Sequence, residues 1–167
     1  SNSFLDMSKS IYEYQQSLEE KVEQRTKELN IKNEELFKLS ITDKLTGLYN
    51  RVKLDSVLQE NMSLSLRYGN IFSVIIIDID FFKKINDNFG HQVGDDVLKE
   101  CSYILSQNIR NVDTLGRWGG EEFLVVCPET LKDGAKDLAI KLNKAIKLHK
   151  FSTYPHSVTI SVGVASC

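Results

Sequence analysis

The sequence has no long apolar run, little proline and cysteine, and no excess of basic charge. A membrane-spanning helix needs about 20 consecutive apolar residues, whereas the apolar runs here, such as Val74–Ile77, have the length of a strand. The formal net charge of −2 gives no positive field for a nucleic-acid backbone. We therefore expect a globular protein with no membrane contact in this chain and no nucleic-acid polymer as a partner.

The three cysteines, Cys101, Cys127 and Cys167, show neither the spacing of a metal site nor a plausible disulfide framework. Such a sparse, odd-numbered set is typical of a reducing compartment, so we expect a cytoplasmic protein whose cysteines serve as small buried apolar side chains. This location is compatible with a parent protein that is anchored to a membrane through an upstream segment.

Residues 4–40 contain neither glycine nor proline and are rich in good helix formers. One stripe of residues repeats in alternating steps of four and three, which is the pattern of a coiled-coil seam. The seam consists of Ile11, Gln15, Leu18, Val22, Arg25, Leu29, Lys32, Leu36 and Leu39. Because the other faces are charged, a lone helix would leave this stripe uncovered. We predict a parallel homodimeric coiled coil over residues 1–40; the alternative is a helix that packs on its own domain.

The chain changes character near residue 40, and we expect a second domain over residues 41–167. Gly47 interrupts the helical pattern, and Asn50 can cap a new helix that runs to about Leu66. Strand and helix patterns then alternate. The predicted strands are 72–79, 114–118, 121–127 and 157–165; the predicted helices are 81–89, 95–109 and 131–149, with a loop at 90–94 and a turn at 119–120. This order, βααββαβ, indicates an α+β fold of the ferredoxin-like kind.

This topology predicts that two acidic residues meet at one edge of the sheet. The first and third strands are central, adjacent and antiparallel, so Asp78 at the end of the first lies beside Glu121 at the start of the third. Neighbouring carboxylates repel each other unless a cation neutralises them, and such hard ligands suit Mg²⁺ or Mn²⁺. The pattern favours phosphoryl chemistry on a nucleotide. The alternative is that both are ordinary surface acids; for Asp80 we favour a role as the cap of the helix that begins at Phe81.

Four segments resemble the motifs of GGDEF domains, the catalytic domains of diguanylate cyclases. They are Asp43–Arg51, Asp78–Asp87 followed by Gly90-His91 and Gly94-Asp95, Arg117–Phe123 with the name-giving turn in its Glu-Glu form, and Ser161–Ala165. The resemblance covers residues 41–167. It implies a palm fold like that of nucleotide cyclases and polymerases, and an enzyme that condenses two GTP into cyclic di-GMP and two pyrophosphates. The preceding helix resembles the signalling helices that join such domains to an upstream sensor.

The resemblance also implies a role for each matching residue. Two Mg²⁺ or Mn²⁺ ions per active site would be bound by Asp78, the Ile79 carbonyl, Glu121 and Glu122. One of the two glutamates would assist deprotonation of the attacking hydroxyl. Guanine would be bound by Asn86 and Asp95. The phosphates would be held by Lys83 and the backbone amides near Phe81 and Phe82, with room left for the substrate by Gly119 and Gly120.

The tetrapeptide Arg110–Asp113 stands five residues before the Gly119-Gly120 turn, where the family has its product-inhibition site. An arginine can bond guanine or phosphate, and an aspartate can accept from a guanine N–H. The resemblance therefore implies that Arg110 and Asp113 bind cyclic di-GMP as an inhibitor. The alternative for these two residues is an exposed ion pair at a spacing of three.

A single guanine pocket per domain implies that two domains face each other, each with one GTP, and the coiled coil would raise the local concentration of the partner. In the family a further segment follows the last predicted strand, and it carries basic residues that grip the phosphates. We expect its absence from this chain to weaken triphosphate binding. Two other classes remain open: a catalytically impaired receptor for GTP or cyclic di-GMP, and a dimerising module that only makes protein contacts.

Overall fold

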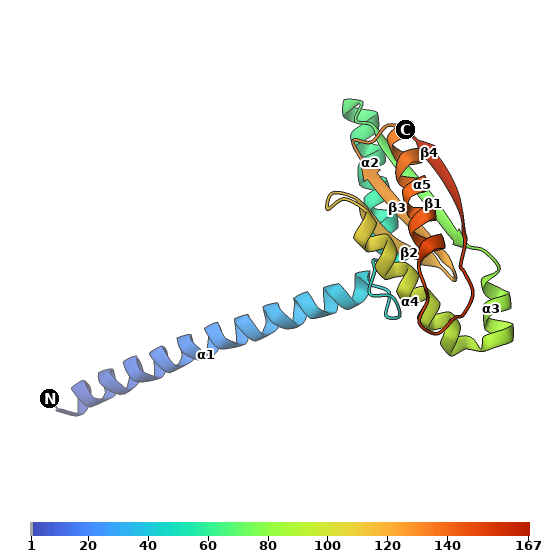
Figure 1. The fold of residues 1–167 in the computed structure, drawn as a ribbon. Helices are drawn as coiled ribbons and strands as arrows, with labels where there is room; N and C mark the ends of the chain where they lie inside the picture. Colours follow the sequence, from blue (N-terminus) through green and yellow to red (C-terminus); the bar gives the residue numbers. More distant parts are fainter. Residues whose placement is uncertain (1) are drawn as a thin grey trace. The chain divides into compact units, whose positions relative to one another are not determined.

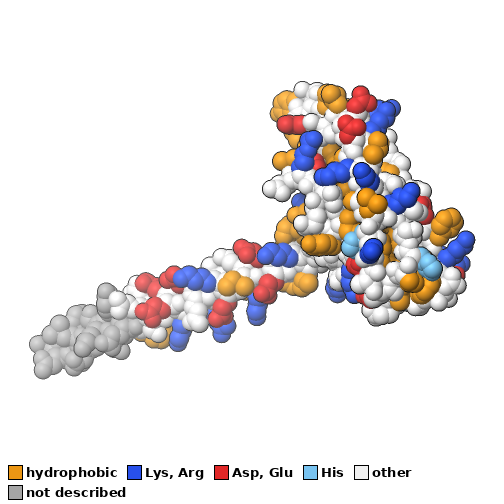
Figure 2. All heavy atoms as spheres, in the orientation of Figure 1, with side chains coloured by type: hydrophobic (Ala, Val, Ile, Leu, Met, Phe, Trp, Pro, Cys, Tyr) orange, Lys and Arg blue, Asp and Glu red, His pale blue; other side chains and the backbone are white. Residues whose placement is uncertain are grey.

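The computed structural model describes the backbone of residues 2–167, and the side chains of Met7 and of residues 14–167. The chain divides into two compact units, Ser1–Ser40 and Ile41–Cys167. The first consists of α1 (Asn2–Ile41), which confirms the predicted N-terminal helix. Along the described part of α1, acidic and basic side chains are interspersed, with scattered apolar side chains among them (Figure 2).

The predicted seam of α1 is exposed in the single chain. Leu18, Val22 and Leu29 have 49%, 58% and 60% of their surface open to solvent, and Leu36 and Leu39 are similar. Ile11 of this seam lies outside the residues whose side chains are described. Side chains of this kind at heptad spacing are the surface that a second helix would cover in a coiled coil.

The second unit is a four-stranded antiparallel sheet with helices on both faces (Figure 1). The strands are β1 (Phe72–Ile79), β2 (Thr114–Gly119), β3 (Glu122–Pro128) and β4 (Ile160–Ser166), in the order β2-β3-β1-β4. The helices are α2 (Arg51–Tyr68), α3 (Phe82–Phe89), α4 (His91–Asn108) and α5 (Lys132–Leu148). The predicted α+β fold is confirmed, and β1 and β3 are the central antiparallel pair.

Alternation along β1 assigns its side chains to two separate cores. Ile75, Ile77 and Ile79 are fully or almost fully buried in the larger core, which also takes in residues of α4 and α5. Phe72 and Val74 belong to a smaller core on the other face, with residues of α2. Asp78 is even-numbered like Phe72 and Val74, so its side chain lies on the α2 face rather than in the larger core.

Local capping determines where α2 begins and ends. The Asn50 side chain accepts a hydrogen bond from the Lys53 backbone N–H at 3.2 Å, as predicted. At the other end Gly69 has φ 70°, and its N–H donates to the Ser65 carbonyl at 2.9 Å. None of the described helices combines the length and the apolar character needed to cross a bilayer.

Several predicted boundaries are wrong, most of them by only one or two residues. The segment 90–94 is not a loop, because a single residue, Gly90 with φ 87°, ends α3 and α4 starts directly at His91 instead of Asp95. The last strand starts at Ile160, three residues later than expected. Glu121 belongs to the turn and β3 starts at Glu122.

The cysteines divide by exposure. Cys101 and Cys127 are buried, as predicted, whereas Cys167 is exposed; all three are free thiols. Burial raises the pKa of the Cys101 thiol to about 12, and the nearby Glu100 charge adds to the effect.

Candidate active site

Three carboxylates meet where β1 ends and β3 begins. Asp78 pairs directly with Glu122 across the antiparallel ladder. Glu121 lies one residue earlier, in the turn, and its carbonyl accepts a hydrogen bond from the Ile79 N–H at 3.4 Å. All three acidic side chains are partly exposed. The structure therefore brings Asp78 to both glutamates, with Glu122 rather than Glu121 as its partner in the ladder.

The negative charge of this cluster is not balanced within the cluster. Burial raises the pKa of Asp78 above its ordinary value, and repulsion from Glu121, Glu122 and Asp80 raises it further. Ionising Asp78 at neutral pH therefore costs free energy that a bound cation would offset. In the described part of the chain, no group of three or more His, Cys, Asp or Glu side chains is arranged to enclose a metal ion. Such an open set of oxygen donors fits Mg²⁺, which completes its shell with water and substrate phosphates.

The β2–β3 turn beside the carboxylates is short and has free space in front of it. β2 and β3 are joined through Gly120 and Glu121, and Gly120 has φ 49°, which suits glycine as the first residue of a two-residue hairpin loop. An added methyl group would meet nothing within 4 Å at either Gly119 or Gly120. A register shift between Arg117 and Gly119 marks a bulge at Trp118. The turn thus leaves space in front of its backbone.

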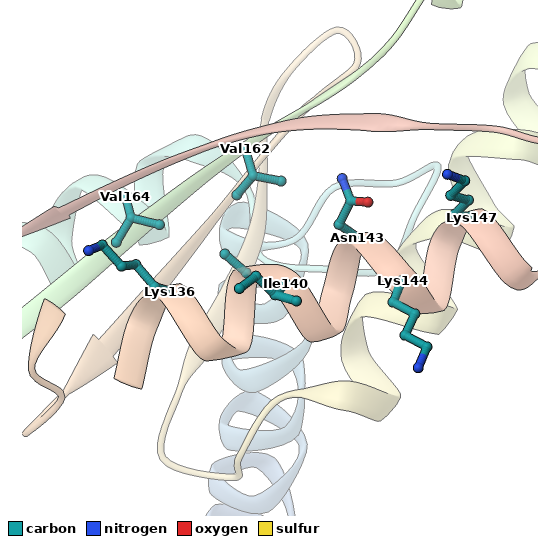
Figure 3. A pocket seen from close by; sticks show the side chains of 8 residues that line it. Lys136, Ile140, Asn143, Lys144, Lys147, Val162 and Val164 are labelled. Atoms are coloured by element: carbon teal, nitrogen blue, oxygen red, sulfur yellow. The ribbon is translucent and has the colours of Figure 1, made fainter. Parts of the chain in front are cut away.

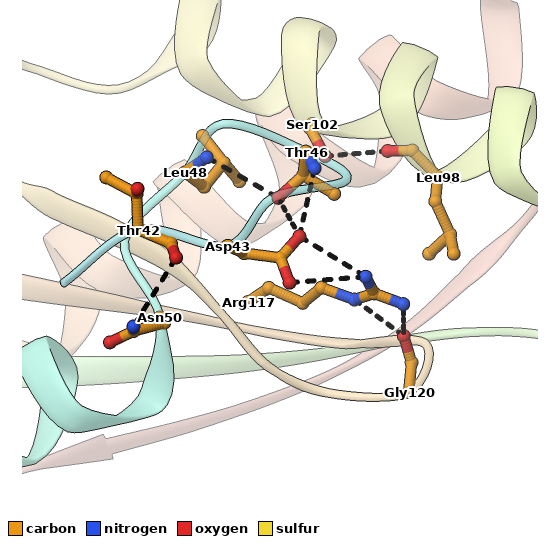
Figure 4. A network of polar contacts seen from close by, with 9 residues as sticks. All are labelled: Thr42, Asp43, Thr46, Leu48, Asn50, Leu98, Ser102, Arg117 and Gly120. Carbon is orange, nitrogen blue, oxygen red and sulfur yellow. Dashed lines mark hydrogen bonds and ion pairs between the residues drawn. The ribbon is translucent and has the colours of Figure 1, made fainter. Parts of the chain in front are cut away.

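Arg117 holds this turn in place (Figure 4). Its Nε and Nη2 donate to the Gly120 carbonyl at 2.9 and 2.7 Å. Its Nη1 donates to the Asp43 carboxylate at 3.2 Å, and both side chains are largely buried. The Arg117 N–H also donates to the Tyr49 carbonyl at 2.8 Å. One guanidinium therefore ties the turn to the segment that precedes α2.

Asp43 is fixed from its other side by Thr46. The Thr46 hydroxyl and backbone N–H both donate to the Asp43 carboxylate, at 2.7 and 2.9 Å. Burial acts to raise the pKa of Asp43, but the Thr46 hydrogen bonds and the Arg117 charge outweigh it, so the pKa is lowered. In the resulting network the Asp43 carboxylate and the Arg117 guanidinium both have hydrogen-bond partners, which favours a single conformation of the turn.

A cavity of about 510 Å³ lies beside the turn, between α3, α4 and the hairpin. It brings together five of the seven predicted nucleotide contacts and one predicted metal ligand, Glu121. The five are Phe82, Lys83, Asn86, Asp95 and Gly120. Asp78, Ile79, Phe81, Gly119 and Glu122 are not among its lining residues. The carboxylate cluster and the cavity therefore meet at Glu121.

The cavity is also lined by residues for which the sequence predicted no role: Asp87, His91, Leu98 and Arg117. A helical spacing could have identified two of these residues. His91, Asp95 and Leu98 are separated by four and three positions, so they share one face of α4. Arg117 could not be found in this way, because its contacts come from tertiary structure.

Gly94 makes room for the Asn86 side chain. A Cβ atom at Gly94 would lie 1.9 Å from the Asn86 Oδ1 and 3.2 Å from a Phe82 ring atom. We expect Gly94→Ala to displace the Asn86 amide from the cavity and to weaken GTP binding about tenfold, the scale of one lost polar contact. Calorimetric titration with GTP measures this. Gly134→Ala, where the nearest atom lies at an ordinary 3.4 Å, is the matched control; equal affinities of the two variants would refute the steric argument.

Asp80 does not cap α3, so that prediction is wrong. The residue that precedes the helix is Phe81, with φ 57°, and no side chain caps the helix there. The Asp80 carboxylate turns instead to the start of β4, where it accepts hydrogen bonds from the Thr159 and Ser161 hydroxyls, each at 2.6 Å. Tertiary partners on another strand thus replace the expected local bond. Phe81 itself is 71% exposed.

Arg110 and Asp113 lie on a separate cavity of about 310 Å³. Asp113 is 9% exposed and accepts from the Arg110 backbone N–H at 2.9 Å, so the alternative of an exposed ion pair is wrong. Its Oδ1 is buried and has no hydrogen-bond partner among the described residues. The Cys127 thiol lines the same cavity; burial raises its pKa to about 12, with a further contribution from the Asp113 charge.

A third hollow, of about 530 Å³, lies between α5 and β4 (Figure 3). Its wall is formed by Ile140, Val162 and Val164, with Lys136, Lys144 and Lys147 around them. None of the predicted site residues lines it. We therefore assign the candidate chemistry to the carboxylate cluster and the cavity beside it.

A βααββαβ sheet with carboxylates at the junction of its central strands defines a palm-like domain. Residues 40–167 match the family model described as "Diguanylate cyclase, GGDEF domain". The chain belongs to this family.

Individual relatives and a solved structure also resemble this chain. The chain is 41% identical to the response regulator PleD of Caulobacter vibrioides over 133 residues, which are 77% of this chain and 29% of that protein. It is 35% identical to diguanylate cyclase A of Treponema denticola, over 99% of this chain and 44% of the relative. The coiled coil and GGDEF domain of DgcB from Caulobacter crescentus, solved in complex with c-di-GMP, superposes with a TM-score of 0.81. That structure is 26% identical, over 90% of this chain and 83% of its own. The chain therefore spans less than half the length of these two curated relatives.

Proposed function

We propose that this chain condenses two GTP molecules into cyclic di-GMP with release of two pyrophosphates. The observation that carries the proposal is the meeting of Asp78, Glu121 and Glu122 at the edge of a cavity lined by Lys83, Asn86 and Asp95. Relatives that are named diguanylate cyclases support it. Carboxylates beside a cavity with amide, carboxylate and ammonium groups suit a nucleotide with its metal ions.

The metal ligands in this proposal are Asp78, Glu121, Glu122 and the Ile79 carbonyl. Two Mg²⁺ or Mn²⁺ ions per active site would neutralise the repulsion that raises the pKa of Asp78. When bound, such ions lower the pKa of a hydroxyl and stabilise charge on phosphate oxygens. Glu121 or Glu122 would accept the proton of the attacking 3′-hydroxyl, since each is partly exposed at the end of the turn.

The nucleotide contacts follow from the cavity beside the turn. Asn86 and Asp95 offer an amide and a carboxylate to the guanine edges. Lys83 and the backbone N–H groups of Phe81 and Phe82 would hold the phosphates at the start of α3. The open space at Gly119 and Gly120 lets the substrate approach the backbone.

One assay tests the proposed function directly. Incubation of this chain with GTP and Mg²⁺ is expected to yield cyclic di-GMP and pyrophosphate in a 1:2 ratio, measured by chromatography. Glu122→Gln should lose this turnover. Binding of GTP without product would favour the receptor alternative, and neither binding nor product would leave a module that makes only protein contacts.

We propose further that the active unit is a homodimer in which each domain brings one GTP, joined by a coiled coil of α1. The exposed seam of α1 supports this. The parent protein would act in the cytoplasm under an upstream sensor, in keeping with its free thiols and the supply of GTP.

A pair of substitutions in α1 tests the dimer. Leu29 lies on the seam and Ile31 lies off it, and the two are equally exposed at 60% and 58%. We expect Leu29→Glu to convert the dimer to monomer in sedimentation and to reduce turnover per molecule about tenfold at low concentration. Ile31→Glu should retain the dimer and the rate. A monomeric wild-type chain at high concentration would contradict this part of the proposal.

The cavity at Arg110 and Asp113 is proposed as the site where cyclic di-GMP inhibits the enzyme. The buried, unpartnered Oδ1 of Asp113 is an acceptor that a guanine N–H could satisfy. We expect Arg110→Ala to leave the initial rate unchanged and to raise the concentration of product needed for half-inhibition at least about tenfold. Progress curves with added cyclic di-GMP measure this. Lys150→Ala is a control for loss of an exposed cation, and unchanged inhibition in Arg110→Ala would refute the assignment.

A further inference from the structure

The backbone between β1 and α3 is held in a conformation that its sequence does not favour. Phe81 has φ 57°, in the left-handed region that non-glycine residues rarely occupy. Burial does not force this conformation, because the side chain is 71% exposed. Its ring contacts the Lys84 ammonium, 4.6 Å from the ring centroid, which is a weak contact at an exposed site. Another group must keep the turn in place.

Asp80 is the group that the structure offers. Its N–H donates to the Thr159 carbonyl at 3.0 Å. Its two carboxylate oxygens accept from the hydroxyls of Thr159 and Ser161, one each, at 2.6 Å. Asp80, the residue immediately before Phe81, is thus held by two hydrogen bonds to Thr159, which directly precedes β4, and by one to Ser161 in that strand. Bonds to an ionised acceptor are the stronger kind.

The turn that Asp80 fastens carries groups the proposed reaction uses. Asp78 and the Ile79 carbonyl lie on its strand side. On its helix side lie the N–H groups of Phe82 and Lys83, the first two of α3, which have no side-chain cap and no carbonyl partner within the helix. A change of φ at Phe81 would alter the direction of these N–H groups, which belong to two residues that line the cavity.

We propose that Asp80 is a positioning residue of the active site, which holds the left-handed Phe81 turn by its bonds to Thr159 and Ser161 and so aims the start of α3 at the nucleotide phosphates. This inference rests on the proposed function. Asp80 acts through the backbone, and its carboxylate is directed at β4 hydroxyls rather than at the substrate.

The first test is a double-mutant cycle between positions 80 and 81. Asp80→Asn keeps the size of the side chain but replaces one acceptor oxygen with a donor, and should raise the KM for GTP about tenfold with a smaller fall in kcat and little change in melting temperature. Glycine adopts positive φ without cost. In the Asp80→Asn background, Phe81→Gly should therefore reverse most of the rise in KM.

The second test uses the partners of Asp80. Thr159→Val removes the hydroxyl and should reproduce the rise in KM, whereas Thr159→Ser retains the hydroxyl and should restore the wild-type value. Ser157→Ala, two residues away, is the matched control. A role of Asp80 through its charge alone would make Thr159→Val silent and Phe81→Gly unable to rescue, and either result would overturn the proposal.

A measurement without substrate separates this inference from the proposed function. Hydrogen exchange of the amides of residues 80–84 should be faster in Asp80→Asn than in wild type, while exchange in the rest of β1 stays unchanged. If the wild-type chain makes no cyclic di-GMP, the proposed function fails, but this comparison still tests whether Asp80 holds the Phe81 turn in place. Equal exchange in both proteins would sink the inference whatever the enzymatic result.

Discussion

Asp78→Asn is expected to abolish formation of cyclic di-GMP and, at the same time, to make the domain more stable at neutral pH. The loss of activity should be at least about a hundredfold, the scale of removing one group that stabilises charge in a transition state. The gain in stability follows from electrostatics, because burial disfavours the charged form of Asp78 and the neighbouring Glu121, Glu122 and Asp80 repel it. A neutral amide of the same size removes both the cost of burying a charge and the repulsion.

The pH dependence gives the sign of this effect. The pKa of Asp78 is higher in the folded chain than its ordinary value of 3.8, so the folded chain binds this proton more tightly than the unfolded chain. Ionisation of Asp78 therefore destabilises the fold, increasingly as the pH rises from 3.8 through the folded-state pKa, and fully above it. The melting temperature of Asp78→Asn should exceed that of wild type at pH 7, and the difference should shrink toward pH 3.

Two controls make this result specific. Asp133→Asn removes a carboxylate whose side chain is 94% exposed and whose ion pair with Lys136, at 3.6 Å, lies on the surface; because exposed pairs contribute little, it should change neither activity nor stability by a comparable amount. Added Mg²⁺ should raise the melting temperature of wild type more than that of Asp78→Asn. A less stable Asp78→Asn with retained turnover would contradict both the electrostatic account and the metal site.

Arg117→Ala is expected to destabilise the domain and to impair turnover together. The substitution removes two bonds to the Gly120 carbonyl and leaves the Asp43 carboxylate without its cation. Losing charge-assisted hydrogen bonds at largely buried groups costs about 2–3 kcal/mol, or roughly 5–10 °C in melting temperature. The Gly119–Glu122 turn would then move freely, so kcat should fall more than binding of GTP.

Arg117→Lys is the informative companion. A lysine keeps the charge near Asp43 but lacks the planar fork that reaches both Asp43 and Gly120. We expect it to restore stability in part and turnover very little. Thermal unfolding and steady-state rates measure the two effects separately. If Arg117→Lys were fully active, the hold on the Gly120 carbonyl would have no catalytic importance.

Acid titration tests the Asp43 half of the same network. The pKa of Asp43 is lowered in the folded chain, so its contribution to stability is present above its ordinary value of 3.8 and is lost as the pH falls below it. Removing Arg117 takes away one of the causes of the lowered pKa of Asp43. The difference in stability between wild type and Arg117→Ala should therefore narrow below about pH 4.

Sequence patterns predicted the parts of this molecule that depend on local periodicity. The run Phe72–Ile79 was a strand to the residue, and the central pairing of β1 with β3 followed from the order of elements. That pairing alone was enough to bring Asp78 to the glutamates. Gly90 and Gly94 led to the wrong prediction of a loop. Gly90 alone separates α3 from α4, and Gly94 lies inside α4, where a larger residue would collide with the Asn86 side chain.

Contacts across the fold could not be read from the sequence. Arg117 and Asp43 are 74 residues apart, and nothing local to either indicates the other. Asp80 stood at a good capping position, yet the hydroxyls of Thr159 and Ser161, about 80 positions later, bind its carboxylate instead. The metal roles of Asp78, Ile79, Glu121 and Glu122 and the contacts of the nucleotide stay predictions.

The exposure of the three cysteines has a practical consequence for labelling chemistry. Maleimides react with thiolates, and Cys101 and Cys127, with pKa values of about 12, remain protonated and buried at neutral pH. Cys167 is exposed. A fluorophore or spin label added to the native chain should therefore attach at one defined position, beside the strand that bears Ser161. In the proposed dimer, two such labels would report the distance between the two domains without any engineered cysteine.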